Sequence, residues 1–236
     1  MIKLGINIDH IATLRELRNS KTPDLLKCAK LAERSGADSI TVHLREDRRH
    51  IKDSDVFHLK KNIKTRLNLE MALADDVIKV ALKAKPHSVC IVPEKRQELT
   101  TEGGLDVIRY RKKLKEVVKI LKNNGIMVSL FINPQAKQVL AAKAVGADCI
   151  ELHTGEYADA RTAGEKKKEL RKLTAAGKIA VRAGLILNAG HGLSTENVAP
   201  VAKIPQMNEL NIGYSIICRS VIVGLCEAVK EIRKLL

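Results

Sequence analysis

Two histidines, three arginines and two carboxylates lie within eight residues of the chain, from His43 to His50. They directly follow Ser39–Val42, an apolar run typical of a buried strand. Imidazoles can transfer protons near neutral pH, and guanidiniums bind phosphate or carboxylate. A solvated surface turn rarely needs two histidines. The octet therefore predicts the rim of a site that moves protons and holds anions.

Polar residues also recur two positions apart near the ends of several strand-like runs. These pairs are Asn7 with Asp9, Thr41 with His43, Asn68 with Glu70, Glu151 with His153, and Glu209 with Asn211. A spacing of two places both members of a pair on one face of a strand. Any one pair could be a hydrogen-bonded core feature, but burying so many unpaired charges would be costly. We therefore expect these side chains to converge at one site.

The residue types at these positions suggest roles in proton transfer. Glu70 and Glu151 can serve as a base and an electrostatic stabiliser if their surroundings separate their pKa values. His43 can titrate near neutrality, and Arg45 suits a phosphate or carboxylate. Further candidates for holding hydroxyls and anions are Asp9, His10 and His50. A metal centre is the competing interpretation, but no HxH or HExxH spacing is present, so we expect no metal.

Glycines mark two further loops. Gly190 and Gly192 flank His191, and Gly213-Tyr214 follows the last strand-like run. In α/β barrels the loops after the seventh and eighth strands, with helix N-termini, form the usual phosphate site. His191 is a candidate general acid there, although a buried structural histidine is the alternative.

The loop 93–104 is strongly charged and ends in two glycines, which is typical either of a hinged lid or of an exposed loop. Lys95 lies just beyond a strand, but no lysine stands at a strand tip. A protein-derived Schiff base is therefore not expected, and in any imine chemistry a substrate would supply the amine.

Short β-rich runs alternate with longer helical patterns along the whole chain. The expected strands are Leu4–Asp9, Ser39–Leu44, Arg66–Met71, Ser88–Val92, Met127–Ile132, Cys149–His153, Leu185–Asn188 and Glu209–Ile212. The expected helical segments include Pro23–Arg34, Ala74–Lys83, Leu105–Asn123, Pro134–Ala144, Asp159–Ala176 and Tyr214–Lys234. This alternation predicts a single (β/α)8 TIM barrel domain over residues 1–236, with extra short helical material in 45–65. An open doubly wound sheet is the alternative, but the first strand is followed by no glycine-rich turn.

Glycines also punctuate the expected helix exits. Gly36 and Gly146 each stand in a Gly-Ala-Asp sequence before a strand, Gly125 lies at a comparable exit, and Gly177 is a further candidate. Glycine after a helix adopts the left-handed conformation at low cost. The recurrence indicates a repeated αβ unit.

Composition sets the class of protein. The chain has 236 residues, 45% of them hydrophobic and 2% aromatic, with a net charge of +15. Seven basic residues between Arg109 and Lys122 suggest solvated outer helices, although a nucleic-acid-binding module is an alternative. Few aromatics argue against single-strand binding. Five scattered cysteines, no membrane-length apolar run and no signal peptide predict a cytoplasmic protein with reduced thiols.

Several of these motifs, in order along essentially the whole chain, resemble the pyridoxine 5'-phosphate synthase family. They are Asn7–Arg15, His43–His50, Asn68–Met71, Val92–Glu98, Glu151–Gly155, Asn188–Leu193 and Glu209–Gly213. The resemblance implies condensation of 1-deoxy-D-xylulose 5-phosphate with 3-amino-2-oxopropyl phosphate to pyridoxine 5'-phosphate, phosphate and water. It also implies no metal or other cofactor, and homo-oligomers that are typically octamers built from dimers.

The family's residue roles transfer to matching positions. His43 and Glu70 would accept protons, His191 would donate one, and Glu151 would stabilise charge. The residues implied for the deoxyxylulose phosphate are Asp9, His10, Arg45, His50 and Thr100. Those implied for the amino-oxopropyl phosphate are Asn7, Arg18, Gly192, Gly213 and Tyr214.

One position departs from the family pattern. Tyr214 stands where family members often carry histidine, so its side chain is a weaker candidate than Gly213. Arg18 could serve its own subunit or a neighbouring one. The other enzymatic interpretation is a different metal-free lyase or isomerase of sugar phosphates on the same barrel.

Overall fold

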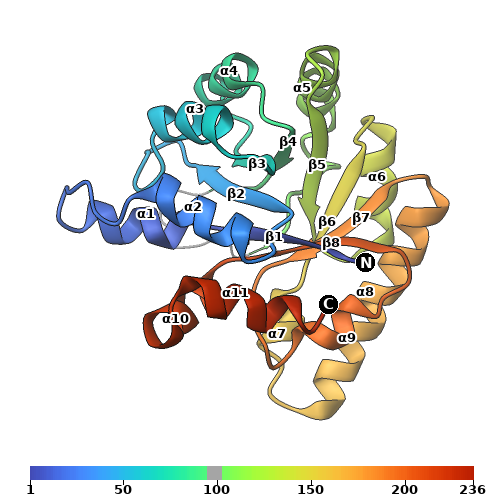
Figure 1. Cartoon of the computed structure of the whole chain (residues 1–236). Coiled ribbons are helices and arrows are strands. Elements are labelled where there is room, and N and C mark those ends of the chain that lie inside the picture. Colours follow the sequence, from blue (N-terminus) through green and yellow to red (C-terminus); the bar gives the residue numbers. More distant parts are fainter. Residues whose placement is uncertain (95–102) are drawn as a thin grey trace.

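Eight parallel strands close into a barrel in the computed structural model, which describes residues 1–94 and 103–236 (Figure 1). The strands are β1 (Lys3–Asn7), β2 (Ser39–Leu44), β3 (Arg66–Met71), β4 (Ser88–Ile91), β5 (Met127–Ile132), β6 (Cys149–His153), β7 (Ile186–Gly190) and β8 (Met207–Ile212). Each strand pairs with the next along the chain, and β1 closes the ring on β8, with Lys3 opposite Glu209. The (β/α)8 prediction is confirmed.

Eleven helices lie outside the strands in the described residues. They are α1 (Asp9–Glu16), α2 (Leu25–Arg34), α3 (Asp53–Asn62), α4 (Asp75–Ala84), α5 (Arg111–Asn123), α6 (Ala136–Ala144), α7 (Gly155–Ala158), α8 (Ala163–Arg182), α9 (Val198–Ala202), α10 (Tyr214–Val223) and α11 (Leu225–Arg233). Helix α3 is the material expected in 45–65. Across residues 1–94 and 103–236, no helix combines the length and apolar content that crossing a bilayer requires.

The strands have two chemically different faces. Outward-facing residues such as Leu4, Ile40 and Leu69 are fully buried against the helices. The alternate positions face the barrel lumen and are largely polar, as Thr41 and Asn68 illustrate. Since period two separates the faces, the hydrophobic core lies between the strands and the helices, and the lumen is left to polar groups.

The first strand is shorter than its alternation predicts. The expected strand over Leu4–Asp9 is wrong at its end, because Asp9 begins α1. The Asn7 side chain accepts a hydrogen bond from the Asp9 N–H at 2.9 Å, and the Ile8 carbonyl accepts one from Ile11 at 3.0 Å. Local capping by asparagine thus turns the chain into a helix at once.

Three expected helices have different bounds. The segment 105–123 becomes helical only at Arg111, and the segment from Asp159 begins at Ala163, after a capping box of Thr162 and Glu165. The last segment divides into α10 and α11 at Gly224, whose φ is 81°.

The glycine exits are confirmed at Gly36, Gly125 and Gly146, with φ of 109°, 75° and 91°. Gly177 is not an exit, because α8 continues through it, and its missing Cβ makes room for the Leu187 side chain. The exit of α8 is Gly184, with φ of 73°.

Candidate active site

A pocket of about 600 Å³ opens at the carboxyl ends of the strands. It brings together residues from widely separated segments. The predicted site residues that line it are Asn7, Asp9, His10, His43, Arg45, His50, Glu70, Glu151, His191, Gly192, Gly213 and Tyr214. Arg18 is exposed in the turn after α1 and is not among the lining residues. Thr100 and most of the candidate lid lie outside the described residues.

His43 stands between two carboxylates near the end of β2. Its Nδ1 lies 4.0 Å from an oxygen of Glu70, and its Nε2 lies 3.4 Å from an oxygen of Glu94. Asp9 accepts a hydrogen bond from the His43 backbone N–H at 2.8 Å. The imidazole is therefore held where it can exchange a proton with a group in the pocket or with either carboxylate.

Glu94 is a site neighbour that the sequence reasoning did not select. It accepts a hydrogen bond from the Glu46 N–H at 3.0 Å and lies 3.5 Å from the Arg45 guanidinium. Burial opposes its charge, but the hydrogen bond and charge of His43 and the charge of Arg45 hold the pKa of Glu94 below its usual value. The available signal was its position directly after β4, which is where barrel enzymes place functional groups.

Glu70 has the opposite electrostatic environment. Burial, followed by the charges of Asp9 and Glu151, raises the pKa of Glu70 well above its usual value, against a hydrogen bond from Asn7. Its side chain retains 18% exposure, toward the pocket it lines. Glu70 is thus a carboxyl that an incoming cation would switch to its charged form.

Glu151 lies deeper, on β6. Its carboxylate accepts a hydrogen bond from Asn211 Nδ2 at 2.6 Å, and the Cys90 thiol lies 3.9 Å away. Burial raises the pKa of Glu151 to about 7, with repulsion from Glu209 adding to the effect and the Asn211 hydrogen bond opposing it. A group that titrates near 7 inside a pocket is suited to proton transfer or to stabilising charge.

His191 is held in a strained backbone conformation. Its φ is 84°, in the left-handed region that non-glycine residues rarely adopt. The Thr154 hydroxyl contacts the carbonyl oxygens of Gly190 and His191, at 2.8 and 2.5 Å. The ring lies 4.9 Å from that of His153 and 6.4 Å from that of Phe131. Such strain persists where the surroundings fix the residue, as at functional sites.

The two imidazoles on this side of the pocket favour the neutral form. Burial lowers the pKa of His191, and burial together with the nearby His191 lowers the pKa of His153 to about 4. A bound phosphate beside His191 would raise the pKa of its imidazole and so favour the protonated form.

One end of the pocket joins the loops after β7 and β8. Ser215 donates a hydrogen bond to the Leu193 carbonyl at 2.6 Å, which ties α10 to the loop that carries Gly192. At Gly213 a Cβ would lie 2.9 Å from Asn7 Cβ, so only glycine allows this approach. The N-terminus of α10 therefore opens on the pocket, an arrangement that could hold an anion.

Tyr214 and His50 are two further residues that line the pocket. The Tyr214 ring packs edge-on against His10, at 5.1 Å between centroids, while the residue remains 67% exposed. The Nδ1 of His50 accepts a hydrogen bond from the Ile51 N–H at 2.8 Å. The other ring nitrogen of a neutral His50 is therefore the donor available to a ligand.

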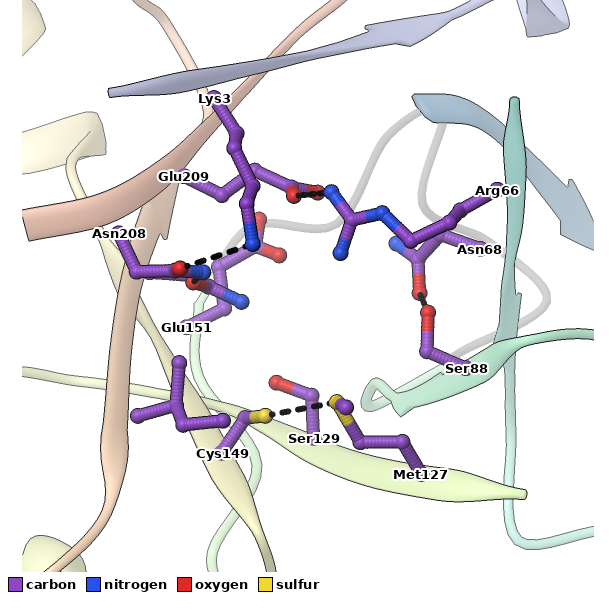
Figure 2. A pocket seen from close by; sticks show the side chains of 12 residues that line it. Lys3, Arg66, Asn68, Ser88, Met127, Ser129, Cys149, Glu151, Asn208 and Glu209 are labelled. Atoms are coloured by element: carbon purple, nitrogen blue, oxygen red, sulfur yellow. Dashed lines mark hydrogen bonds and ion pairs between the residues drawn. The ribbon is translucent and has the colours of Figure 1, made fainter. Parts of the chain in front are cut away.

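Not all the paired polar residues reach this rim. The expectation of convergence is wrong for Asn68 and Glu209, which line a separate cavity of about 50 Å³ at the amino ends of the strands (Figure 2). Thr41 and His153 line neither cavity. Glu209 forms an ion pair with Arg66 there and accepts a hydrogen bond from Ser39 at 2.9 Å. Strand stagger is the reason, because Glu209 pairs with Lys3, the first residue of β1.

Three rim side chains also have the geometry of a metal site. Asp9, His43 and Glu70 each offer a ligand atom, and these atoms lie within 4.8 Å of one another. Carboxylate and imidazole ligands suit several divalent transition metals. The absence of a metal from the reaction remains a prediction.

Comparison with known proteins identifies full-length relatives. A family model described as pyridoxal phosphate biosynthesis protein PdxJ matches residues 4–236. A pyridoxine 5'-phosphate synthase of Coxiella burnetii (strain Dugway 5J108-111) is 54% identical over 236 residues, covering 100% of this chain and 98% of the relative. The enzyme of the same name from Syntrophotalea carbinolica is 53% identical, with the same coverage.

Solved structures with low sequence identity share the fold. A 3-hexulose-6-phosphate synthase superposes with a TM-score of 0.68 at 18% identity, covering 100% of both chains. A thiamine phosphate pyrophosphorylase from Pyrococcus furiosus superposes with a TM-score of 0.61 at 18% identity, covering 99% of this chain and 95% of that one. At such identities these matches support the barrel fold alone.

Proposed function

This chain belongs to the family of pyridoxal phosphate biosynthesis protein PdxJ, and on that premise we propose that its rim pocket synthesises pyridoxine 5'-phosphate. The reaction is the condensation of 1-deoxy-D-xylulose 5-phosphate with 3-amino-2-oxopropyl phosphate, which also yields phosphate and water. The observation that carries the proposal is the full-length identity of 54% to a synthase of this name.

The pocket chemistry supports a substrate amine as the nucleophile. No lysine is found among the described residues that line the pocket. The amine of 3-amino-2-oxopropyl phosphate can attack the ketose carbonyl directly, and water leaves as the imine forms. The ammonium form of that substrate would lower the raised pKa of Glu70, so binding itself would prepare a base that accepts the amine proton.

The other proton transfers follow from position. His43, between Glu70 and Glu94, is the second proposed proton acceptor. His191 is the proposed proton donor, and a neighbouring phosphate would favour its protonated form. Glu151, deeper in the lumen, is proposed to stabilise positive charge that develops during ring closure.

Substrate placement is proposed from the two ends of the pocket. The residues proposed for the deoxyxylulose phosphate are Asp9, His10, Arg45, His50 and Thr100. Those proposed for the amino-oxopropyl phosphate are Asn7, Arg18, Gly192, Gly213 and Tyr214. The close backbone approach at Gly213 and the N-terminus of α10 support the second set.

We also propose that the chain assembles as a homo-oligomer, an octamer built from dimers. Four large apolar side chains on or next to α1 and in α10 are strongly exposed, namely Leu14, Leu17, Val221 and Ile222. Exposed apolar surface of this kind typically marks a protein interface. Since α1 borders the pocket, the exposed Arg18 of one subunit could serve a neighbour's pocket.

The remaining proposals concern setting and partners. The five free cysteines support a reducing, cytoplasmic location. We propose that residues 1–236 act as a single domain that uses no metal or other cofactor and binds no nucleic acid, its positive charge serving to attract two anionic substrates.

The direct test is incubation of the purified protein with both phosphorylated substrates, with spectroscopic detection of the pyridoxine chromophore. We expect product only when both are present, with release of inorganic phosphate. Consumption of one substrate alone would instead favour a lyase or isomerase. Salt-sensitive duplex binding that is unaffected by substitutions at His43, Glu70 and His191 would favour the nucleic-acid module.

A further inference from the structure

A continuous chain of side-chain hydrogen bonds crosses the barrel lumen and ends on Glu151. Ser88 donates to Asn68 at 2.8 Å, and Asn68 donates to Thr41 at 3.3 Å. Thr41 donates to Asn211 at 3.2 Å, and Asn211 donates to Glu151 at 2.6 Å. Figure 2 shows the first of these bonds, with Glu151 across the same space. The residues that form these four hydrogen bonds come from five strands. We call the four bonds together the relay.

The direction of the relay follows from the carboxylate. An ionised Glu151 can only accept, so the amide NH₂ of Asn211 must face it, which turns the Asn211 oxygen toward Thr41. A hydroxyl has one proton, so Thr41, which donates to that oxygen, must accept from Asn68. Asn68 in turn presents its oxygen to Ser88. Every link is consistent with a charged Glu151.

Two glycines within strands make room for the end of the relay. At Gly5 in β1 a Cβ would lie 1.9 Å from the Asn211 side-chain oxygen, and at Gly190 in β7 it would lie 2.4 Å from a Glu151 oxygen. Glycine in a strand interior is unfavourable and often marks a close approach by another group. Glycine at these two positions therefore leaves the space that the Asn211 and Glu151 side chains occupy.

In the described residues, the titratable neighbours that act on Glu151 are Glu70 from β3, Cys90 from β4 and Glu209 from β8. Lys3 and Arg66 line the amino-end cavity that Glu151 also borders, but Lys3 donates to Asn208 at 3.3 Å and Arg66 pairs with Glu209. Glu70 and Glu209 disfavour a second negative charge, whereas the Asn211 N–H and, to a smaller extent, the Cys90 thiol support the ionised form of Glu151.

We propose that Thr41 and Asn211 are positioning residues for the pocket reaction, with Thr41 fixing the Asn211 amide so that its NH₂ always faces the Glu151 carboxylate. This inference rests on the proposed role of Glu151 in pyridoxine 5'-phosphate synthesis. Neither Thr41 nor the inner links of the relay line the pocket, so they would act only through Asn211.

The test compares Thr41→Val with Thr41→Ser across pH. Valine keeps the shape of threonine but removes the hydroxyl, so the Asn211 amide can turn its oxygen toward Glu151 and favour the protonated acid. The pKa that governs kcat should rise by about one unit, and kcat near pH 7 should fall up to about tenfold with little change in KM. Thr41→Ser should restore the wild-type profile.

A matched control removes a threonine hydroxyl elsewhere. Thr174 donates only within α8, to Leu170 at 2.8 Å, so Thr174→Val should leave the pH profile unchanged. If Thr41→Val does not fold, Ser88→Ala interrupts the relay at its far end, and a smaller shift in the same direction is expected.

The outcomes separate the two proposals. A Thr41→Val or, failing that, a Ser88→Ala profile identical to wild type overturns the relay, while the synthase proposal stands. Wild-type protein that forms no product from both substrates overturns the proposed function itself. A Glu151→Gln variant with full activity would remove the role of Glu151 and with it the purpose of the relay.

Discussion

The two ends of the barrel lumen hold buried carboxylates in opposite ways. At the amino end, Glu209 is neutralised by the Arg66 guanidinium and bonded by Ser39. At the carboxyl end, Glu70 and Glu151 repel each other, and their pKa values are raised. One carboxylate is compensated for stability, and the other two are left available for chemistry. A buried acid alone therefore does not identify a site, but a buried acid in a pocket whose pKa is raised is a candidate for one.

Of the substitutions that test this comparison, Glu70→Gln should have the largest effect, and the effect should be on turnover. Removing a base that is required at the carboxyl end should lower kcat by about 10²- to 10⁴-fold, because general base catalysis contributes about that much. Folding and phosphate binding should remain nearly intact, as thermal unfolding and ligand titration would show. Glu46→Gln, which changes an exposed carboxyl of the same rim, is the control. A purified Glu70→Gln enzyme with a near wild-type rate would exclude the required base.

Arg66→Met should act on stability instead. It leaves the Glu209 carboxylate, whose side chain is 6% exposed, without its cation. The free energy of unfolding should fall by about 2 kcal/mol, less than for a fully buried pair because Arg66 is 36% exposed. Urea denaturation measures this change, with Arg66→Lys as the milder control. Turnover by the folded variant should fall far less than in Glu70→Gln. A variant with unchanged stability and a turnover as low as that of Glu70→Gln would contradict the difference between the two ends.

Glu151→Gln should stabilise the protein in a pH-dependent way and should lower turnover. A folded-state pKa of about 7, above the usual 4.5, means that ionisation of Glu151 opposes folding as pH rises through this range. Glutamine stays neutral, so the variant should be more stable by about 3 kcal/mol at pH 8, with the difference shrinking toward zero below pH 4.5. Urea titrations at both pH values measure it. If wild type and Glu151→Gln were equally stable at pH 8, ionisation of Glu151 would not oppose folding.

The strands were the most predictable part of the fold. The bounds of β2, β3, β5 and β6 match the sequence-based expectation, since apolar residues on the outer face alternate with polar residues on the inner face. The end of β1 was not predictable by the same rule. Alternation continues through Asp9, but the Asn7–Asp9 hydrogen bonds and the bonds from Ile11 and Ala12 to the Ile8 carbonyl turn the chain into α1.

The site was predictable by residue type but not by height along the barrel. Glu151 and Glu209 have the same pattern in sequence, yet strand stagger confines Glu209 to the amino-end cavity, whereas Glu151 borders both that cavity and the rim pocket. Glu94 was missed because its contacts with His43 and Arg45 join segments about fifty residues apart. The relay was missed for a similar reason. Four of its members belong to the polar pairs noted in the sequence, but only closure of the barrel joins them to one another and to Ser88.

The separation between the two faces of each strand has a consequence for adaptation. Mutations that alter reactivity fall on lumen positions, whereas folding depends on the aliphatic side chains that point toward the helices, such as Ile40 and Leu69. New activities could therefore be selected by varying inward positions near the carboxyl ends of the strands, which leaves the Arg66–Glu209 pair and the outer core unchanged. A library confined to those positions should contain a larger share of folded proteins than one that varies the outward positions equally.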